Sequence, residues 1–288
     1  MSESILSLPR GRALALDGPA LVMGIVNATP DSFYASSRLS ALDPSSIDAI
    51  ADMVKAGAAI IDIGGESTRP GSAYVSLDEE LSRVLPIVER IRLRWDIAIS
   101  IDTRKARLAQ AALEAGADII NDVSALFDDP EMAPLCASMG VPVVLMHKKG
   151  IPQSMQVEPW YELCLEEVLA YLLSAARRAM TAGIAQEAII LDPGIGFGKR
   201  LEDNLELLAR LDEIAASGYP VLVGVSRKSF IAALSGAGAE ERLPGSLAAA
   251  CAARAKGASI FRVHDVAETV QALAVFDAAC GRPISQAL

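Results

Sequence analysis

Polar and charged side chains stand at the ends of eight short apolar runs, and their types could do chemistry. Every run is apolar until its last residues, which recur as Asn and Asp. In chain order the polar ends include Asn27, Asp62, Asp102, Asn121, Asp122, His147, Asp192, Ser226 and His264. A buried Asp or Asn without a partner costs about 1–3 kcal/mol. The set therefore predicts a site for a polar ligand with several hydrogen-bond donors.

The acidic members of this set favour a flat ligand that is rich in donors. Asp102, Asn121 and Asp192 come from nearby runs and could accept hydrogen bonds from amidine-type N–H groups of a heterocycle. Their charge could also stabilise a cation that develops during a reaction. Asp192 could instead cap the loop 193–198 that follows it.

The basic members favour an anion. They are Arg69, Arg227, Lys228, Arg262 and His264, and four of the five belong to the seventh and eighth runs. If the runs are the strands of a (β/α) barrel, the loops after the seventh and eighth strands are where such barrels commonly bind phosphate. Lys228 and Arg262 are interpreted as ligand-binding residues, whereas Arg227 could instead pair with a loop carboxylate. Ser229 is expected to open a helix whose backbone N–H groups add to the anion site.

Composition limits the class of partner. With 26 Lys and Arg against 36 Asp and Glu, the net charge is −10, which argues against nucleic acid and against an anionic membrane. Cys136, Cys164, Cys251 and Cys280 form no CxxC pair and the chain has two histidines, so a Cys/His zinc site is not expected. No signal pattern and no long uncharged apolar stretch is found, so the expected compartment is the cytoplasm.

Two familiar catalytic motifs are excluded. The stretch from Gly194 to Lys199 looks like a phosphate loop, but Pro193 and Arg200 stand where a Walker A motif needs Gly and Ser or Thr. No GxSxG sequence is present, so the nucleophile elbow of α/β-hydrolases is absent. Met146, near the end of the fifth run, and Phe197, in the stretch that follows the sixth run, are apolar and could stack on a flat ligand or simply pack.

The elements that must position these residues alternate along the chain. Strands are predicted at 21–27, 59–64, 97–102, 119–122, 141–147, 188–192, 221–226 and 260–264, because each run is nearly continuous in apolar character. Helices are predicted at 44–56, 77–94, 104–115, 130–139, 160–183, 202–217, 245–257 and 266–279, with a short helical turn at 228–235. Ser76 is interpreted as a helix N-cap, and a glycine follows six of the helices as a left-handed C-cap.

Eight strands that alternate with eight helices predict a single (β/α)8 TIM barrel of the α/β class. The competing fold, an open doubly wound sheet, usually has a glycine-rich first turn, and no GxGxxG follows the first strand. The barrel is expected over 20–280, after an N-terminal extension or short cap (1–19) and before a C-terminal tail (281–288). Its active site is expected at the C-terminal ends of the strands, where the polar residues converge.

Eight motifs, in order along nearly the whole chain, resemble those of dihydropteroate synthase, a family of pterin-binding TIM barrels. They are NATPDSF at 27–33, GGESTRPG at 64–71, IDT at 101–103, IND at 120–122, LMH at 145–147, DPGIGFGK at 192–199, SRKS at 226–229 and RVH at 262–264. GGESTRPG together with DPGxGFGK and SRKS is a highly specific combination.

The resemblance implies a transferase. Enzymes of this family condense (7,8-dihydropterin-6-yl)methyl diphosphate with 4-aminobenzoate, which gives 7,8-dihydropteroate for folate biosynthesis and releases diphosphate. The family mechanism is dissociative: C–O cleavage leaves a pterin-methyl cation, and the arylamine then attacks it. The resemblance also implies a homodimer, Mg²⁺ as a cofactor, and sulfonamides that compete with 4-aminobenzoate.

The resemblance also assigns roles by matching position. Asp102, Asn121, Asp192 and Lys228 would hold the pterin, with Met146 and Phe197 packing near it. Thr68, Arg69, Asn27, Arg262 and His264 would serve the diphosphate, with Asn27 as the Mg²⁺ ligand. Arg69, Pro70, Lys228 and Ser229 would lie near the aminobenzoate. Asp102, Lys228, Arg262 and His264 are the expected catalytic residues: Asp102 would stabilise the cation, and Arg262 and His264 the leaving diphosphate.

The first loop departs from the family pattern. Members usually continue Asp-Ser-Phe with Ser-Asp-Gly-Gly, whereas this chain continues Asp31-Ser-Phe with Tyr-Ala-Ser-Ser and Arg38. Ala35 stands where the family has an Asp that takes part in closing the site over the diphosphate and the aminobenzoate. The departure bears on loop closure and turnover, and it leaves the pterin pocket untouched.

Two other functions are alternatives. A methyltetrahydrofolate-type methyltransferase barrel would keep the acidic pterin residues but would need no diphosphate cluster, and the SRKS and RVH motifs argue against it. A non-catalytic paralogue that binds pterin without turnover would be consistent with Ala35.

Overall fold

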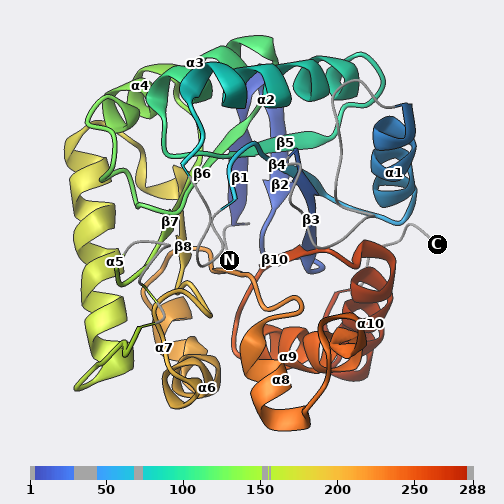
Figure 1. Cartoon of the computed structure of the whole chain (residues 1–288), viewed down its shortest axis with the longest axis vertical. Helices are drawn as coiled ribbons and strands as arrows, with labels where there is room; N and C mark the ends of the chain where they lie inside the picture. The colour runs from blue at the N-terminus through green and yellow to red at the C-terminus, as the bar shows by residue number, and fades with distance from the viewer. Residues whose placement is uncertain (1–3, 29–43, 68–73, 151–154, 156, 284–288) are drawn as a thin grey trace.

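A computed structural model describes residues 4–28, 44–67, 74–150, 155 and 157–283, and it forms the predicted (β/α)8 barrel (Figure 1). The parallel strands lie side by side in the order β8-β7-β6-β5-β4-β3-β10-β9. A parallel bridge between Leu191 and Val221 brings the two edges of this sheet together. The helices lie around the outside of the strands (Figure 1). The barrel predicted from the alternation of elements is therefore confirmed.

The strands follow the predicted apolar runs. They are β3 (Leu21–Asn27), β4 (Ile60–Gly64), β5 (Ala98–Asp102), β6 (Ile119–Asp122), β7 (Val143–Met146), β8 (Ile189–Asp192), β9 (Leu222–Val223) and β10 (Ile260–Val263). The prediction of a strand over 221–226 is too long. The chain leaves the ladder after Val223, and by Arg227 it has turned into the left-handed region, with φ +56°.

The helices also lie close to their predicted ranges, with one exception. They are α1 (Pro44–Lys55), α2 (Leu77–Arg92), α3 (Ala106–Ala115), α4 (Met132–Met139), α5 (Cys164–Thr181), α6 (Leu201–Ala209), α7 (Leu211–Ala215), α8 (Ser229–Ser235), α9 (Leu243–Ala255) and α10 (Val266–Ala279). The single helix predicted at 202–217 is wrong. It is interrupted at Arg210 (φ −112°, ψ +23°), whose guanidinium pairs with Glu206 and Glu213 on either side of the break.

The predicted helix caps are present. The Ser76 hydroxyl accepts a hydrogen bond from the backbone N–H of Glu79 at 3.3 Å, which satisfies an open donor of the first turn of α2. The glycines predicted as C-caps all have positive φ, and at Gly116 the value is +117°. Within the described part of the chain, no helix is long and apolar enough to cross a membrane.

A hairpin that the sequence analysis did not resolve covers the N-terminal end of the barrel. Strands β1 (Ile5–Leu8) and β2 (Arg12–Ala15) pair antiparallel around a short 3-10 turn. Leu6 and Leu8 pack, together with Leu16, on the inward-facing residues at the starts of the barrel strands, such as Ile60 and Ile119. The hairpin thus forms an apolar floor beneath the barrel. The domain bounds at residues 20 and 280 stay predictions.

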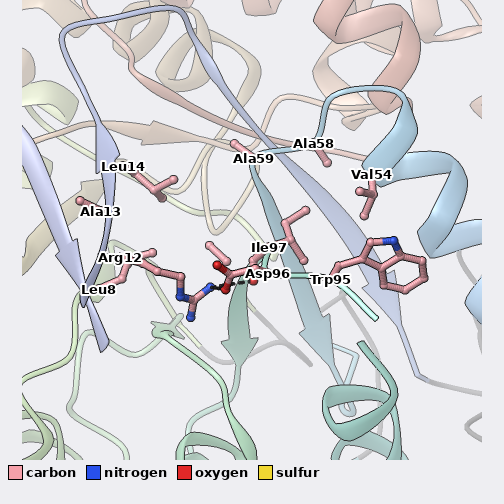
Figure 2. Close-up of a pocket in the computed structure, with 11 residues that line it drawn as sticks. Leu8, Arg12, Ala13, Leu14, Val54, Ala58, Ala59, Trp95, Asp96 and Ile97 are labelled. Carbon is pink, nitrogen blue, oxygen red and sulfur yellow. Dashed lines mark hydrogen bonds and ion pairs between the residues drawn. The ribbon is translucent and has the colours of Figure 1, made fainter. Parts of the chain in front are cut away.

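One buried carboxylate ties this hairpin to the barrel. Asp118 is fully buried and accepts hydrogen bonds from the guanidinium groups of Arg10, Arg12 and Arg92, the last at 2.8 Å. Asp118 also accepts a hydrogen bond from the backbone N–H of Ile99 in β5, at 2.9 Å. Figure 2 shows Arg12 of β2 reaching Asp96 as well, beside the shallow pocket under the hairpin. Three cations on one buried anion fix the hairpin in place.

We predict that Asp118→Asn lowers the free energy of unfolding by about 3 kcal/mol, because the guanidinium groups lose the charge that compensates their burial. Urea denaturation of the variant and the parent measures this difference. Asp96→Asn is the matched control. Its carboxylate pairs with Arg12 and Arg92 but is 82% exposed, so the expected loss is below about 1 kcal/mol. Equal losses in the two variants would contradict the prediction.

Candidate active site

The polar side chains at the strand ends face the interior of the barrel, because they are an even number of positions from the apolar residues that face inward on the same strands. Alternate residues of a barrel strand face the same side. Ile60, Ala98, Ile119, Ile190 and Ile260 belong to the inner apolar cluster, and counting on by twos reaches Asp62, Asp102, Asn121, Asp192 and Arg262. The strand register also sets Asp102 opposite Asn121, and Met146 opposite Asp192. A polar layer therefore lies above an apolar floor.

Arg262 of β10 holds this polar layer together. Its Nε donates to Asp62 of β4 at 2.7 Å, and a terminal nitrogen donates to Asp102 of β5 at 2.8 Å. The amide of Asn121 lies 3.4 Å from both carboxylate oxygens of Asp62. Four strands are thereby joined through side chains that are far apart in the sequence.

Asp62 was not predicted as a binding residue, although it ends an apolar run. It is fully buried and supports both Arg262 and Asn121. The available signal was its spacing from Ile60 and its position two residues before the strand ends at Gly64. Glycine at that end leaves Asp62 as the last inward-facing side chain of β4.

Burial and charge set the protonation of Asp102. Burial and the negative charge of Asp62, opposed by the attraction of Arg262, together raise its pKa to about 7. For Arg262, burial opposes the charged form, but the carboxylates of Asp62 and Asp102 outweigh it, so its pKa is raised. The site can therefore place a carboxylate whose charge changes near neutral pH beside a permanent cation.

Asp192 shapes the loop that follows β8. Its Oδ1 accepts the backbone N–H of Gly194 at 2.7 Å, so the loop-capping alternative is confirmed. Burial outweighs the hydrogen bond from the Gly194 N–H and the positive charge of Lys228, so the pKa of Asp192 is raised to about 6. Asp192 is 6% exposed and lies at the inner edge of the site. A capping role does not remove it from the group of potential acceptors.

Lys228 and Phe197 come together across this loop. The Nζ of Lys228 lies 4.1 Å from the centre of the Phe197 ring, within the range of a cation–π contact. Gly196 has φ +82°, and a Cβ atom there would lie 3.1 Å from Cδ of Lys228. Lys228 therefore lies directly over the loop. Met146, buried at the end of β7, is the neighbour of Asp192 in the register.

Of the four members of the predicted basic cluster that the structure describes, Arg227 turns to loop carboxylates, and Lys228, Arg262 and His264 lie at the strand ends. Arg227 donates to Asp265 at 2.7 Å and pairs with Glu240 at 3.3 Å, so the alternative of a loop-carboxylate partner is confirmed. His264 lies beside Ser226, with its Nδ1 3.1 Å from the Ser226 hydroxyl. Ser229 begins α8, as predicted.

The remaining predicted residues lie outside the described ranges, at the end of β3, or on the outer side of β6. Thr68, Arg69, Pro70 and Ala35 lie outside the residues that the structure describes. Asn27 ends β3 and is partly buried. Asp122 has the opposite parity to Asn121, and its carboxylate accepts the N–H groups of Ser124 at 2.7 Å and Leu126 at 3.1 Å. It therefore caps a turn on the outer side.

Comparison with known proteins places the chain. The family model described as "Pterin binding enzyme" matches residues 23–264. The dihydropteroate synthase of Escherichia coli K12 is 48% identical over 272 residues, which are 93% of this chain and 94% of that protein.

Solved structures agree with this assignment. The Yersinia pestis dihydropteroate synthase in a sulfonamide drug complex has a TM-score of 0.91 at 42% identity, covering 96% of this chain and 99% of that one. The Xanthomonas albilineans dihydropteroate synthase with 4-aminobenzoic acid has a TM-score of 0.88 at 42% identity, covering 98% of this chain and 100% of that one. The chain therefore belongs to the dihydropteroate synthase family of pterin-binding enzymes.

Proposed function

We propose that the site condenses (7,8-dihydropterin-6-yl)methyl diphosphate with 4-aminobenzoate to give 7,8-dihydropteroate and diphosphate. The observation that carries this proposal is the polar layer in which Arg262 joins Asp62 and Asp102 beside Asn121. It combines acceptors for a donor-rich ring with a cation for an anionic leaving group. Family membership supplies the identity of the two substrates.

The acceptors would hold the pterin. Asp102, Asn121 and Asp192 face the same interior, and their oxygens suit the N–H groups of an aminopyrimidinone ring. Met146 and Phe197 supply apolar surface beside them. Burial makes these hydrogen bonds selective, because a ring that leaves a buried carboxylate unpaired loses its compensation.

The cations would hold the diphosphate. A guanidinium group has five N–H donors, and Arg262 uses two of them on Asp62 and Asp102. Those that are left can bind phosphate oxygens without breaking the polar layer. Lys228 and His264, from neighbouring strand ends, would complete the anion site together with Arg69.

Asn27 would hold Mg²⁺. Among the residues described, no group of three or more His, Cys, Asp or Glu side chains could hold a metal ion. Mg²⁺ that is bound mainly through substrate phosphates and water needs only one or two protein oxygens, and the side-chain oxygen of Asn27 at the end of β3 fits that need. The ion would neutralise charge on the leaving diphosphate.

The charge pattern suits a dissociative reaction. When the C–O bond breaks, the diphosphate leaves with both electrons and the pterin-methyl group becomes a cation. Asp62, Asp102 and Asp192 surround the interior with carboxylates, and an ionised Asp102 would stabilise that cation. The arylamine nitrogen then forms the new C–N bond and loses a proton to solvent water. A fixed carboxylate field is enough for this sequence, without a strong base.

Two further proposals concern the oligomeric state and the cellular compartment. The exposed side of α10 includes Ala274, Val275 and Ala278 beside the polar Gln271, and Val275 is 65% exposed. Such a face suits a second copy of the chain, so we propose a homodimer. The cytoplasm stays the predicted compartment.

We predict that the purified protein releases diphosphate from (7,8-dihydropterin-6-yl)methyl diphosphate with Mg²⁺ and 4-aminobenzoate, and forms dihydropteroate. Parallel reactions omit the arylamine. Pterin binding without turnover would favour the non-catalytic paralogue, in which case Ala35→Asp is the next variant. Turnover with a methyl-folate donor instead would favour the methyltransferase alternative.

We predict that kcat/KM rises with pH as Asp102 ionises. The pKa of Asp102 in the free protein is about 7, so its carboxylate is mostly protonated below that pH and charged above it. Asp102→Asn should lower kcat at least about a hundredfold, change pterin affinity less than about threefold, and remove this dependence. The pH profiles of both proteins measure it. Equal losses in kcat and in affinity would contradict the cation-stabilising role.

We predict that Lys228→Ala weakens the binding of each substrate by about tenfold. The reason is that the ammonium lies over the loop that carries Phe197 and belongs to the proposed anion site. Pterin binding by calorimetry and the KM for 4-aminobenzoate are the measurements. Lys256→Ala is the control. That lysine lies at the end of α9, 41% exposed and paired with Asp212. If neither constant changes in Lys228→Ala, the assignment of Lys228 is wrong.

A further inference from the structure

The loop between β8 and α6 (residues 193–200) is folded around one buried lysine. Lys199 is 3% exposed, and its Nζ lies 2.9 Å from Nδ1 of His147, 3.0 Å from the Gly194 carbonyl and 3.2 Å from the Phe197 carbonyl. An ammonium group has three N–H donors, so each can take one of these acceptors. The side chain thus links both halves of the loop to the end of β7.

Lys199 is held by neutral groups. Within the described ranges no carboxylate forms a salt bridge with it, and burial lowers its pKa to about 7. Burial, and then the charge of Lys199, lowers the pKa of His147, so the imidazole is neutral and its Nδ1 is the acceptor. An apolar side chain could fill this space without the cost of desolvating an ammonium group. The contribution of Lys199 to the structure of the loop therefore lies in its hydrogen bonds.

The loop needs such hydrogen bonds to keep its shape. Gly194, Gly196 and Gly198 alternate along it with positive φ, and a Cβ at Gly194 would collide with the carbonyl oxygen of His147. Glycine backbones lose more conformational entropy on ordering than any others. Other side chains anchor the loop as well. Asp192 binds the Gly194 N–H, and the Tyr161 hydroxyl donates to the Gly198 carbonyl at 2.8 Å. The Asn204 amide accepts the Gly196 N–H at 2.6 Å and donates to the Arg200 carbonyl at 2.7 Å, whereas Lys199 is the side chain that binds the Phe197 carbonyl.

The shape of the loop sets two residues of the proposed pterin subsite. Phe197 is carried by the loop, and its backbone carbonyl is one of the acceptors of Lys199. Its ring supports Lys228, which also touches the loop at Gly196. We propose that Lys199, with His147 as its partner, is a positioning residue that holds Phe197 and Lys228 in place for the pterin. This inference rests on the proposed function.

The test compares wild type with Lys199→Met, which keeps the length of the side chain but has no donor. Binding of (7,8-dihydropterin-6-yl)methyl diphosphate is measured by calorimetry without 4-aminobenzoate, together with the KM for 4-aminobenzoate and the melting temperature. The pterin Kd should rise at least about tenfold, since several hydrogen bonds are lost, and the KM for 4-aminobenzoate should change less than about threefold. Lys256→Met is the control with unchanged binding.

Loss of stability alone does not satisfy the proposal. If Lys199→Met melts at a lower temperature but binds pterin within twofold of wild type, the inference is overturned. If Lys199→Met does not fold, the test is made with Tyr161→Phe. That variant removes one hydrogen bond from the same loop and should raise the pterin Kd about threefold. An unchanged Kd in that variant overturns the inference. Absence of pterin binding by wild type instead overturns the proposed function, and this inference with it.

Discussion

The bridge from Arg262 to Asp62 and Asp102 is the interaction on which the interior of this barrel depends. Buried carboxylates are unfavourable unless they are paired and hydrogen-bonded. Arg262 supplies that compensation from β10 for residues of β4 and β5, and Asn121 completes it from β6. Without a cation at this point the strands could not end in acidic residues that face inward. The inward-facing positions of Asp62 and Asp102 therefore depend on one arginine.

The two ends of the barrel use opposite arrangements of charge. Beneath the strands, the carboxylate of Asp118 is surrounded by three arginines, so the charges compensate within the protein and the hairpin is fixed. At the carboxyl ends the arrangement is reversed, because one arginine, Arg262, pairs with two carboxylates, Asp62 and Asp102. The first arrangement lies away from the proposed site, whereas the second lies beside Lys228 and the acceptors that are proposed to bind the substrates. Stability and chemistry are thus separated to opposite ends of one sheet.

The sequence was sufficient for the barrel and for the edge that carries the site, because buried parallel strands are apolar runs that end in polar residues. It was not sufficient where a property depends on pairing in space. Asp62 is tied to Arg262, 200 positions away, and only the closed sheet brings them together. Arg227 and Lys228 are adjacent cations, yet one turns to Asp265 and the other to Phe197. The break at Arg210 likewise reflects local ion pairs that periodicity does not reveal.

The shortness of β9 gives the barrel a seam. A single bridge, Leu191 to Val221, joins β8 to β9, with one nearby hydrogen bond from Leu191 to the Pro220 carbonyl at 2.9 Å. Elsewhere in the ring, β3 and β4 are registered over five residue pairs. Asp192 ends one side of the seam and Lys228 follows the other. Asp192 and Lys228, two of the residues proposed to bind the pterin, therefore flank the junction of the ring that is held by the fewest backbone pairs.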